Sequence, residues 1–150
     1  MGQQQLLLLV LATVIVGIAT VVGIQAFSQN NAKSNADAML NDAVRIASDV
    51  QAWSQKAKPF GGPVTFGDYG SATFPLISYE ATGTPATYST LNGDFTLASG
   101  VITGTKDSDN DGTADQQVQV RVCGLSDDDV KGAVITVGGV GTGTTAAPGC

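Results

Sequence analysis

Histidine is absent from the 150 residues of this chain, and charged residues and cysteines are scarce. Without histidine, catalysis by a Ser-His-Asp or a Cys-His arrangement is excluded. With only two cysteines, the chain also lacks the ligands of a tetrahedral zinc site. Charged residues make up 13% of the chain, against about 25% in an average soluble domain. Seven basic residues are scattered along a chain of net charge −6, so we expect no nucleic-acid partner.

The longest stretch without charge is the N-terminal one, because the first charged residue is Lys33. Residues 6–24 are all Leu, Val, Ile, Ala, Gly or Thr, and about 20 apolar residues are enough to cross a bilayer as a helix. A secretory signal peptide would begin with basic residues and end at a small-residue cleavage site. Here residues 3–5 are glutamines and no such site follows. A single-span membrane anchor fits the length better.

The helical pattern continues beyond the apolar run. Residues 32–58 contain neither proline nor glycine, and their apolar residues recur at steps of three and four, which predicts an amphipathic helix. The predicted apolar face consists of Ala36, Met39, Leu40, Ala43, Val44, Ala47, Val50 and Trp53. Proline and glycine at residues 59–63 end the pattern. We predict one helix of about 80 Å from about residue 3 to about residue 57, unless residues 28–35 break it into two.

From residue 64 onward the pattern is that of short strands separated by glycine and proline. Strands are predicted at residues 64–66, 72–74, 76–79, 86–91, 117–122 and 133–137. Val118, Val120 and Val122 alternate with polar residues, as in a half-buried antiparallel strand. Asn92-Gly93 predicts a two-residue hairpin turn. The predicted fold class is therefore α+β: a long helix (residues 1–58), apolar and then amphipathic, followed by a small antiparallel β-sheet head (residues 59–150).

A head with so few aromatic residues should need additional stabilisation. Cys123 and Cys150 are expected to form a disulfide if the chain leaves the cytoplasm. This bond would tie the glycine-rich tail, residues 138–150, to the end of a strand. Closing a loop of about 28 residues stabilises the fold by about 3.5 kcal/mol in the loop-entropy model.

Residues 107–115 match the acidic calcium pattern D-x-D-x-D-G-x-x-D. Calcium prefers hard oxygen ligands that converge within a short loop. The expected ligands are Asp107, Asp109, Asp111, the carbonyl of Thr113, and Asp115. The loop is not a full EF-hand, because Val118 stands where the bidentate glutamate would be. The alternative is a solvated acidic turn.

A second acidic run follows at residues 127–129. It either adds a ligand to the calcium loop or caps a short helical turn. Because Glu80 is the only glutamate and the aspartates cluster in this way, we expect no enzymatic activity.

An uncharged apolar N-terminal helix, its amphipathic extension, a small β head and a late disulfide together resemble a type IV pilin subunit. That resemblance implies that a prepilin peptidase removes a short basic leader and that the mature helix waits in the membrane before assembly. The chain begins at Met1 without such a leader, as expected of a mature subunit. The family commonly has glutamate at the fifth mature position, thought to pair with a neighbour's terminal amine. Gln5 stands here and can hydrogen-bond but cannot neutralise a charge.

The resemblance also implies that subunits polymerise helically, with their apolar helices in the filament core. The residues expected at these helix contacts are Gln5, Leu6, Leu9, Val10, Val14, Gly17, Ile18, Val21, Ile24 and Phe27. Small residues such as Gly17 and Gly23 permit close approach of helices. Since the helix contains no proline, we predict that it stays continuous between these glycines.

The expected function is therefore that of a structural subunit of an extracellular, calcium-stabilised homopolymer that is inserted in the membrane before assembly. A type II secretion pseudopilin is the close alternative, since such proteins resemble pilins. A single-span, membrane-anchored calcium-binding adhesin is the alternative from another class. The sequence identifies no receptor or surface ligand.

Overall fold

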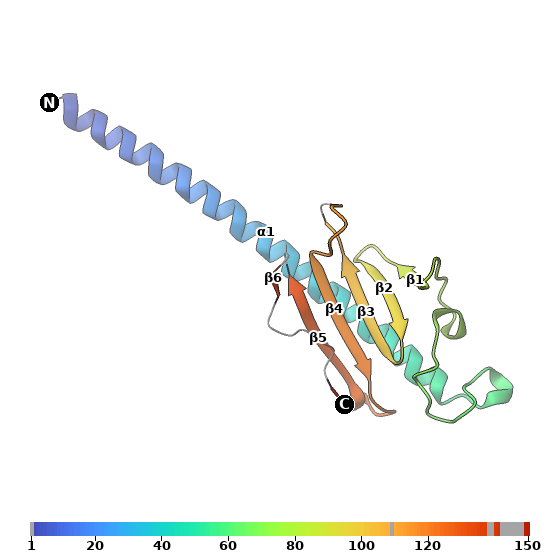
Figure 1. Cartoon of the computed structure of the whole chain (residues 1–150). Helices are drawn as coiled ribbons and strands as arrows, with labels where there is room; N and C mark the ends of the chain where they lie inside the picture. The colour runs from blue at the N-terminus through green and yellow to red at the C-terminus, as the bar shows by residue number, and fades with distance from the viewer. Residues whose placement is uncertain (1, 109, 138–139, 142–148) are drawn as a thin grey trace.

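A computed structural model describes residues 2–108, 110–137, 140–141 and 149–150 (Figure 1). The chain begins with a single helix, α1 (Gly2–Ser54), of 53 residues, which spans about 80 Å. Three short 3-10 helices follow in the head: η1 (Lys58–Phe60), η2 (Phe74–Ile77) and η3 (Asp127–Asp129). The predicted continuous helix is confirmed, and it ends three residues earlier than expected.

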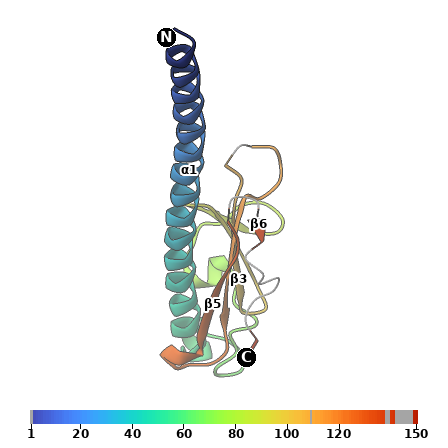
Figure 2. The same cartoon turned by 90° about the vertical axis from the view of Figure 1, so that its left-hand side faces the viewer.

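Within the described residues the sheet has six strands, which pair in sequence order, each antiparallel to its neighbours. The strands are β1 (Thr87–Ser89), β2 (Asp94–Ala98), β3 (Val101–Lys106), β4 (Gln116–Val122), β5 (Val130–Val137) and β6 (Val140–Gly141). The sheet lies along the C-terminal half of α1, while the N-terminal half projects alone (Figures 1 and 2). The predicted α+β fold class is confirmed.

The core lies between α1 and one face of the sheet. Met39, Ala43 and Val50 from the helix are fully buried against strand residues such as Phe95 and Val118. The buried stripe of α1 comprises Ala36, Met39, Ala43, Ile46, Ala47, Val50, Gln51, Trp53 and Ser54. It follows the helical period and matches most of the predicted face. Of the predicted face, Val44 is exposed and Leu40 is only half-buried. The stripe also includes three residues that the predicted face omitted, Ile46, Gln51 and Ser54.

The first three predicted strands are wrong. Residues 64–66 form no regular element, and residues 74–77 form the 3-10 helix η2, which has Pro75 in its first turn. Ala72 and Phe74 are nevertheless buried in the core cluster. These two side chains therefore pack into the core from segments that are not strands. The short apolar runs reflect this packing rather than strand pairing.

Among the later strands, β4 and β5 confirm the predictions for residues 117–122 and 133–137, and β4 alternates between buried and half-buried residues. The run 86–91 contains only the three-residue strand β1. Strand β3 was not predicted, because Gly104 occupies one of its buried positions and interrupts the apolar alternation. A Cβ at Gly104 would lie 2.7 Å from Cε1 of Phe95, so the core ring requires glycine there.

The hairpin at residues 90–93 is confirmed, but its predicted turn type is wrong. Ser89 pairs with Asp94, and neither Asn92 nor Gly93 has a positive φ. The left-handed two-residue turn lies instead at Ser99 and Gly100, with φ of 51° and 73°. Asn92 instead donates a side-chain hydrogen bond to Asp42 of α1 at 2.8 Å, and Gly93 allows the hairpin to approach the helix closely.

Candidate assembly helix and acidic loop

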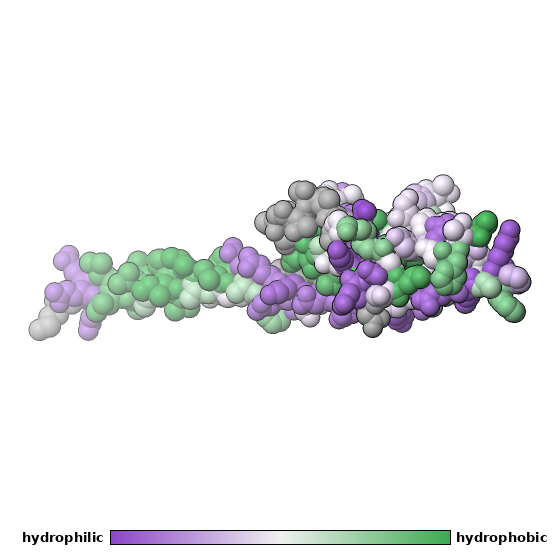
Figure 3. All heavy atoms as spheres, turned by 90° about the horizontal axis from the view of Figure 1, so that it is seen from below, coloured by the Kyte–Doolittle hydropathy of each residue, from purple (hydrophilic) through white to green (hydrophobic). Residues whose placement is uncertain are grey.

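The N-terminal half of α1 is an uncovered apolar rod. Every residue from 2 to 31 is exposed, and the large apolar side chains between Leu6 and Phe27 are 51% to 72% exposed. In length and composition this helix could cross a membrane, and none of its most apolar window is buried within the chain. Figure 3 shows the apolar surface running along the projecting half.

All the residues predicted for helix contacts lie on this uncovered half and are exposed: Gln5, Leu6, Leu9, Val10, Val14, Gly17, Ile18, Val21, Ile24 and Phe27. A shallow apolar groove along the helix is lined by Ile15, Ile18, Ala19, Val22, Gly23 and Ala26. A Cβ added at Gly17 or Gly23 would meet no atom within 4 Å. No contact among the described residues therefore requires glycine at these two positions.

Side-chain hydrogen bonds hold the head to α1 where the uncovered half ends. The Asn35 amide donates to Oε1 of Gln116 at 2.6 Å and to the carbonyl of Asn92 at 3.2 Å. At the other end of the packed half, the buried Gln51 amide donates to the carbonyls of Gly124 and Ser126 at 2.8 and 3.0 Å. The head is thus fixed to the helix at both ends.

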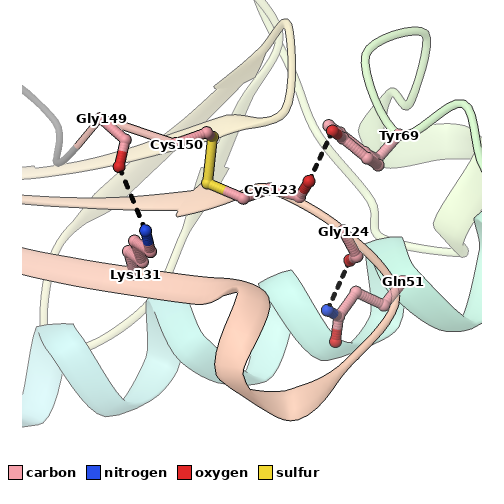
Figure 4. The surroundings of a disulfide bond; sticks show 7 residues. All are labelled: Gln51, Tyr69, Cys123, Gly124, Lys131, Gly149 and Cys150. Atoms are coloured by element: carbon pink, nitrogen blue, oxygen red, sulfur yellow. Dashed lines mark hydrogen bonds between the residues drawn. A yellow bond between two sulfur atoms is a disulfide. The ribbon is translucent and has the colours of Figure 1, made fainter.

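The predicted disulfide between Cys123 and Cys150 is confirmed, with a Cα–Cα distance of 5.5 Å. Cys123 follows β4, and its carbonyl accepts a hydrogen bond from the Tyr69 hydroxyl at 2.8 Å. Lys131 of β5 donates to the carbonyl of Gly149 at 3.5 Å. As Figure 4 shows, the disulfide and these bonds tie the last residues of the chain to β4 and β5.

The acidic loop, residues 107–115, joins β3 to β4. Asp107 accepts hydrogen bonds from the amides of Asn110 and Gly112 at 2.7 and 2.8 Å. Asp115 accepts one from the amide of Ser108 at 2.8 Å, and Asp111 accepts one from the amide of Thr113 at 2.7 Å. The loop is therefore folded around the carboxylates of its own aspartates.

The structure does not test the predicted calcium ligands as a set. Asp109 lies outside the described residues, and among the residues that are described no group of three acidic side chains is placed to hold a metal. Asp107, Asp111, Thr113 and Asp115 do lie in one loop, and Gly112 makes its turn with a φ of 86°. Calcium binding here stays a prediction.

The second acidic run lies away from this loop. It forms η3, between β4 and β5, whereas the acidic loop precedes β4, so seven strand residues separate the two. At about 3.3 Å per residue that strand is more than 20 Å long. Asp129 accepts a hydrogen bond from the amide of Ser126 at 3.0 Å. Of the two predicted roles, the structure places this run in a short helical turn, and it cannot add a ligand to the acidic loop of its own chain.

An interaction that the sequence analysis missed joins α1 to the segment after η2. The Tyr79 hydroxyl donates to Oδ2 of Asp49 at 2.5 Å, and the Arg45 guanidinium lies 6.0 Å from the centre of the Tyr79 ring. Burial, with a smaller contribution from Asp49, raises the pKa of Tyr79 above its ordinary value. The spacing of Arg45 and Asp49, four residues apart on one helix face, was the signal available in the sequence.

Comparisons with family models, curated proteins and solved structures find no match to this chain.

Proposed function

We propose that this protein is a structural subunit that polymerises helically into an extracellular filament of the type IV pilus kind. The apolar halves of α1 form the core of that filament, and the β heads face solvent. The observation that carries the proposal is the uncovered apolar half of α1, which continues without a break into a half that is locked into the head.

The size of this apolar surface is unfavourable for a chain that remains alone in water. Fourteen large apolar side chains between Leu6 and Phe27 are more than half exposed. Burying them is worth on the order of 20 kcal/mol, at 1.5–3 kcal/mol for each fully buried side chain and with part of each already covered by the helix. A bilayer hides this surface before assembly, and neighbouring copies of the same helix hide it in the filament.

The two glycines of the apolar run favour contacts between helices over a simple lipid anchor. Glycine costs a helix interior about 1 kcal/mol relative to alanine, and in the part of the chain that the structure describes no close contact offsets this cost at Gly17 or Gly23. A lipid-facing anchor has no use for such positions. Closely packed helices do, because small residues let their backbones approach.

In the same proposal the acidic loop binds one Ca²⁺ through Asp107, Asp109, Asp111, the Thr113 carbonyl and Asp115. Support comes from the spacing of these ligands and from the amide hydrogen bonds that fold the loop around Asp107. A bound cation offsets the repulsion between carboxylates that are held in one short loop. The role proposed for the ion is to stabilise the head, and no catalytic step involves it.

The test is to shear the surface of the cells that produce the protein and to examine the sheared material by negative-stain microscopy and mass spectrometry. The wild-type chain is expected in long filaments. Gly17→Leu keeps the run apolar and long enough for a membrane, but it places a bulky side chain where helices approach. It should leave the chain in the membrane fraction without filaments, whereas the control Val16→Leu should assemble normally. A wild-type chain that detergent extracts as a monomer, with no filaments, would establish the membrane-anchor alternative instead.

A further inference from the structure

The head has two ends that differ in character. We call the end toward the uncovered half of α1 the proximal end, and it includes the hairpin loop 90–93 and the acidic loop (Figures 1 and 2). The distal end includes residues 55–67, which follow α1. Asn35 contacts the proximal hairpin and Ser54 accepts a hydrogen bond from the amide of Gly67. Because Asn35 and Ser54 are 19 residues apart on α1, the two ends of the head lie about 28 Å apart along the helix axis.

The distal end carries an exposed apolar patch on a loop that is held in place. Phe60 and Val64 are each 81% exposed and Phe66 is 69% exposed. The indole N–H of Trp53 donates a hydrogen bond to the carbonyl of Gly61 at 2.8 Å, and the amide of Gly67 donates one to the carbonyl of Ser54, the last residue of α1. These bonds keep the apolar side chains pointing into solvent, and a cluster of this kind marks a site of contact with another molecule.

Positive charge borders this distal patch. Lys56 and Lys58 are exposed at the start of the same loop. Asp68, directly after this loop, and the acidic run Asp127–Asp129, in the turn between β4 and β5, also lie at this end, so the basic character is confined to the start of the loop. The distal end therefore presents apolar side chains with lysines on one side.

The proximal end has the complementary features. Leu91, at the tip of the hairpin, is 95% exposed, and its carbonyl accepts a hydrogen bond from Lys106 at 2.9 Å. Beside it lies the acidic loop, in which Asp111 is exposed. One projecting leucine next to a loop of negative charge matches a patch of apolar side chains next to two lysines.

We propose that the distal end of one head docks on the proximal end of the head of a second copy. Leu91 of one copy inserts among Phe60, Val64 and Phe66 of the other, and Lys56 and Lys58 face the acidic loop. This inference rests on the filament proposed above. Chains that leave one membrane in one orientation assemble with parallel helices, so heads displaced along the helix axis meet distal end to proximal end. A contact between two different surfaces does not close on itself, and it repeats along a filament.

The test crosslinks neighbouring heads in sheared filaments of the full-length chain. The double variant Leu91→Cys with Val64→Cys is treated with a short bismaleimide reagent and run on a denaturing gel. The native cysteines are joined in a disulfide and do not react. We expect a ladder of covalent oligomers. The matched control, Leu91→Cys with Leu76→Cys, should give monomer, because Leu76 is an exposed apolar residue on η2 rather than at the distal end.

A second variant covers the case in which the cysteines prevent assembly. Leu91→Ser should leave the thermal unfolding of the head unchanged, since Leu91 is 95% exposed in the described structure, while filaments are lost or become several-fold shorter. Normal filaments from Leu91→Ser, or filaments of the cysteine variant that give no ladder, would overturn the docking and leave the filament proposal standing. Failure of the wild-type chain to form any filament would instead defeat the filament proposal itself.

Discussion

Substitutions at Gly93 and Gly112 give the sharpest test of the structure, because the two positions need glycine for different physical reasons. At Gly93 the φ is not positive, but a Cβ would lie 2.8 Å from the carbonyl oxygen of Thr105 and 2.9 Å from Cε of Met39. At Gly112 the φ is 86° and a Cβ would meet nothing within 4 Å. Substitution at Gly93 should therefore fail through crowding, and substitution at Gly112 through backbone strain.

The expected magnitudes follow from these contacts. Gly93→Ala overpacks a site between the backbone of β3 and the fully buried Met39, which costs about 1–3 kcal/mol. Gly93→Asn should cost more, because it adds further atoms to the same space. Gly112→Ala should cost about 1–2 kcal/mol for the left-handed conformation. Gly112→Asn should recover part of that cost, because asparagine visits this region more readily.

The assay is urea unfolding of the full-length chain in detergent micelles with a calcium chelator present. It is followed by the fluorescence of Trp53, the only tryptophan, which is buried where α1 meets the head. The prediction is a crossed order: asparagine is worse than alanine at Gly93 and better than alanine at Gly112. If Gly93→Asn were as stable as the wild type, the left-handed turn predicted from Asn92-Gly93 would be correct and the reasoning from crowding would be refuted.

Three further predictions also follow unfolding by the fluorescence of Trp53, with heat in place of urea and no chelator in the calcium experiment. Replacing both Cys123 and Cys150 by serine should lower the free energy of unfolding by about 3.5 kcal/mol, since the denatured chain regains the entropy of a closed loop; an unchanged urea midpoint would contradict this. Added Ca²⁺ should raise the melting temperature of the wild-type head and EGTA should reverse the rise, whereas Asp107→Asn should respond weakly; equal melting curves with and without EGTA would remove the calcium site. Because burial raises the pKa of Tyr79, its contribution to stability is complete below the ordinary tyrosine pKa of about 10 and is lost as pH rises through the higher folded value. Tyr79→Phe should therefore lose less stability than the wild type above that pH, and parallel pH profiles would count against the assignment.

The helical half of the fold could be predicted because its signals are local and repeated. An uncharged run and a period of three to four residues determine α1, and strict alternation determines β4. The disulfide followed from having two cysteines and one possible pairing. The loops between residues 55 and 86 could not be predicted in this way. Residues such as Phe74 lie in the core because of contacts with distant strands, which local β propensity does not encode.

The candidate functional site could likewise be predicted only in part from the sequence. The apolar half of α1 is visible in the sequence, since no charged residue precedes Lys33. The side chains that join the head to α1 are not, because Asn35 and Gln116 lie 81 residues apart and Gln51 and Gly124 lie 73 apart. The two ends of the head were also invisible, because exposed apolar residues such as Leu91 and Phe60 look like ordinary core residues until the fold places them on the surface.

Whether copies of α1 cover one another's apolar surface can be seen in a three-dimensional reconstruction of the sheared filament by electron cryo-microscopy. We expect residues 2–31 of neighbouring copies to pack at the filament axis as helices unbroken between Gly17 and Gly23, with the heads outside. An extended segment between those glycines would refute the continuous helix alone. A filament whose axis is built from the heads, with the apolar half of α1 directed outward, would refute the proposed helix core.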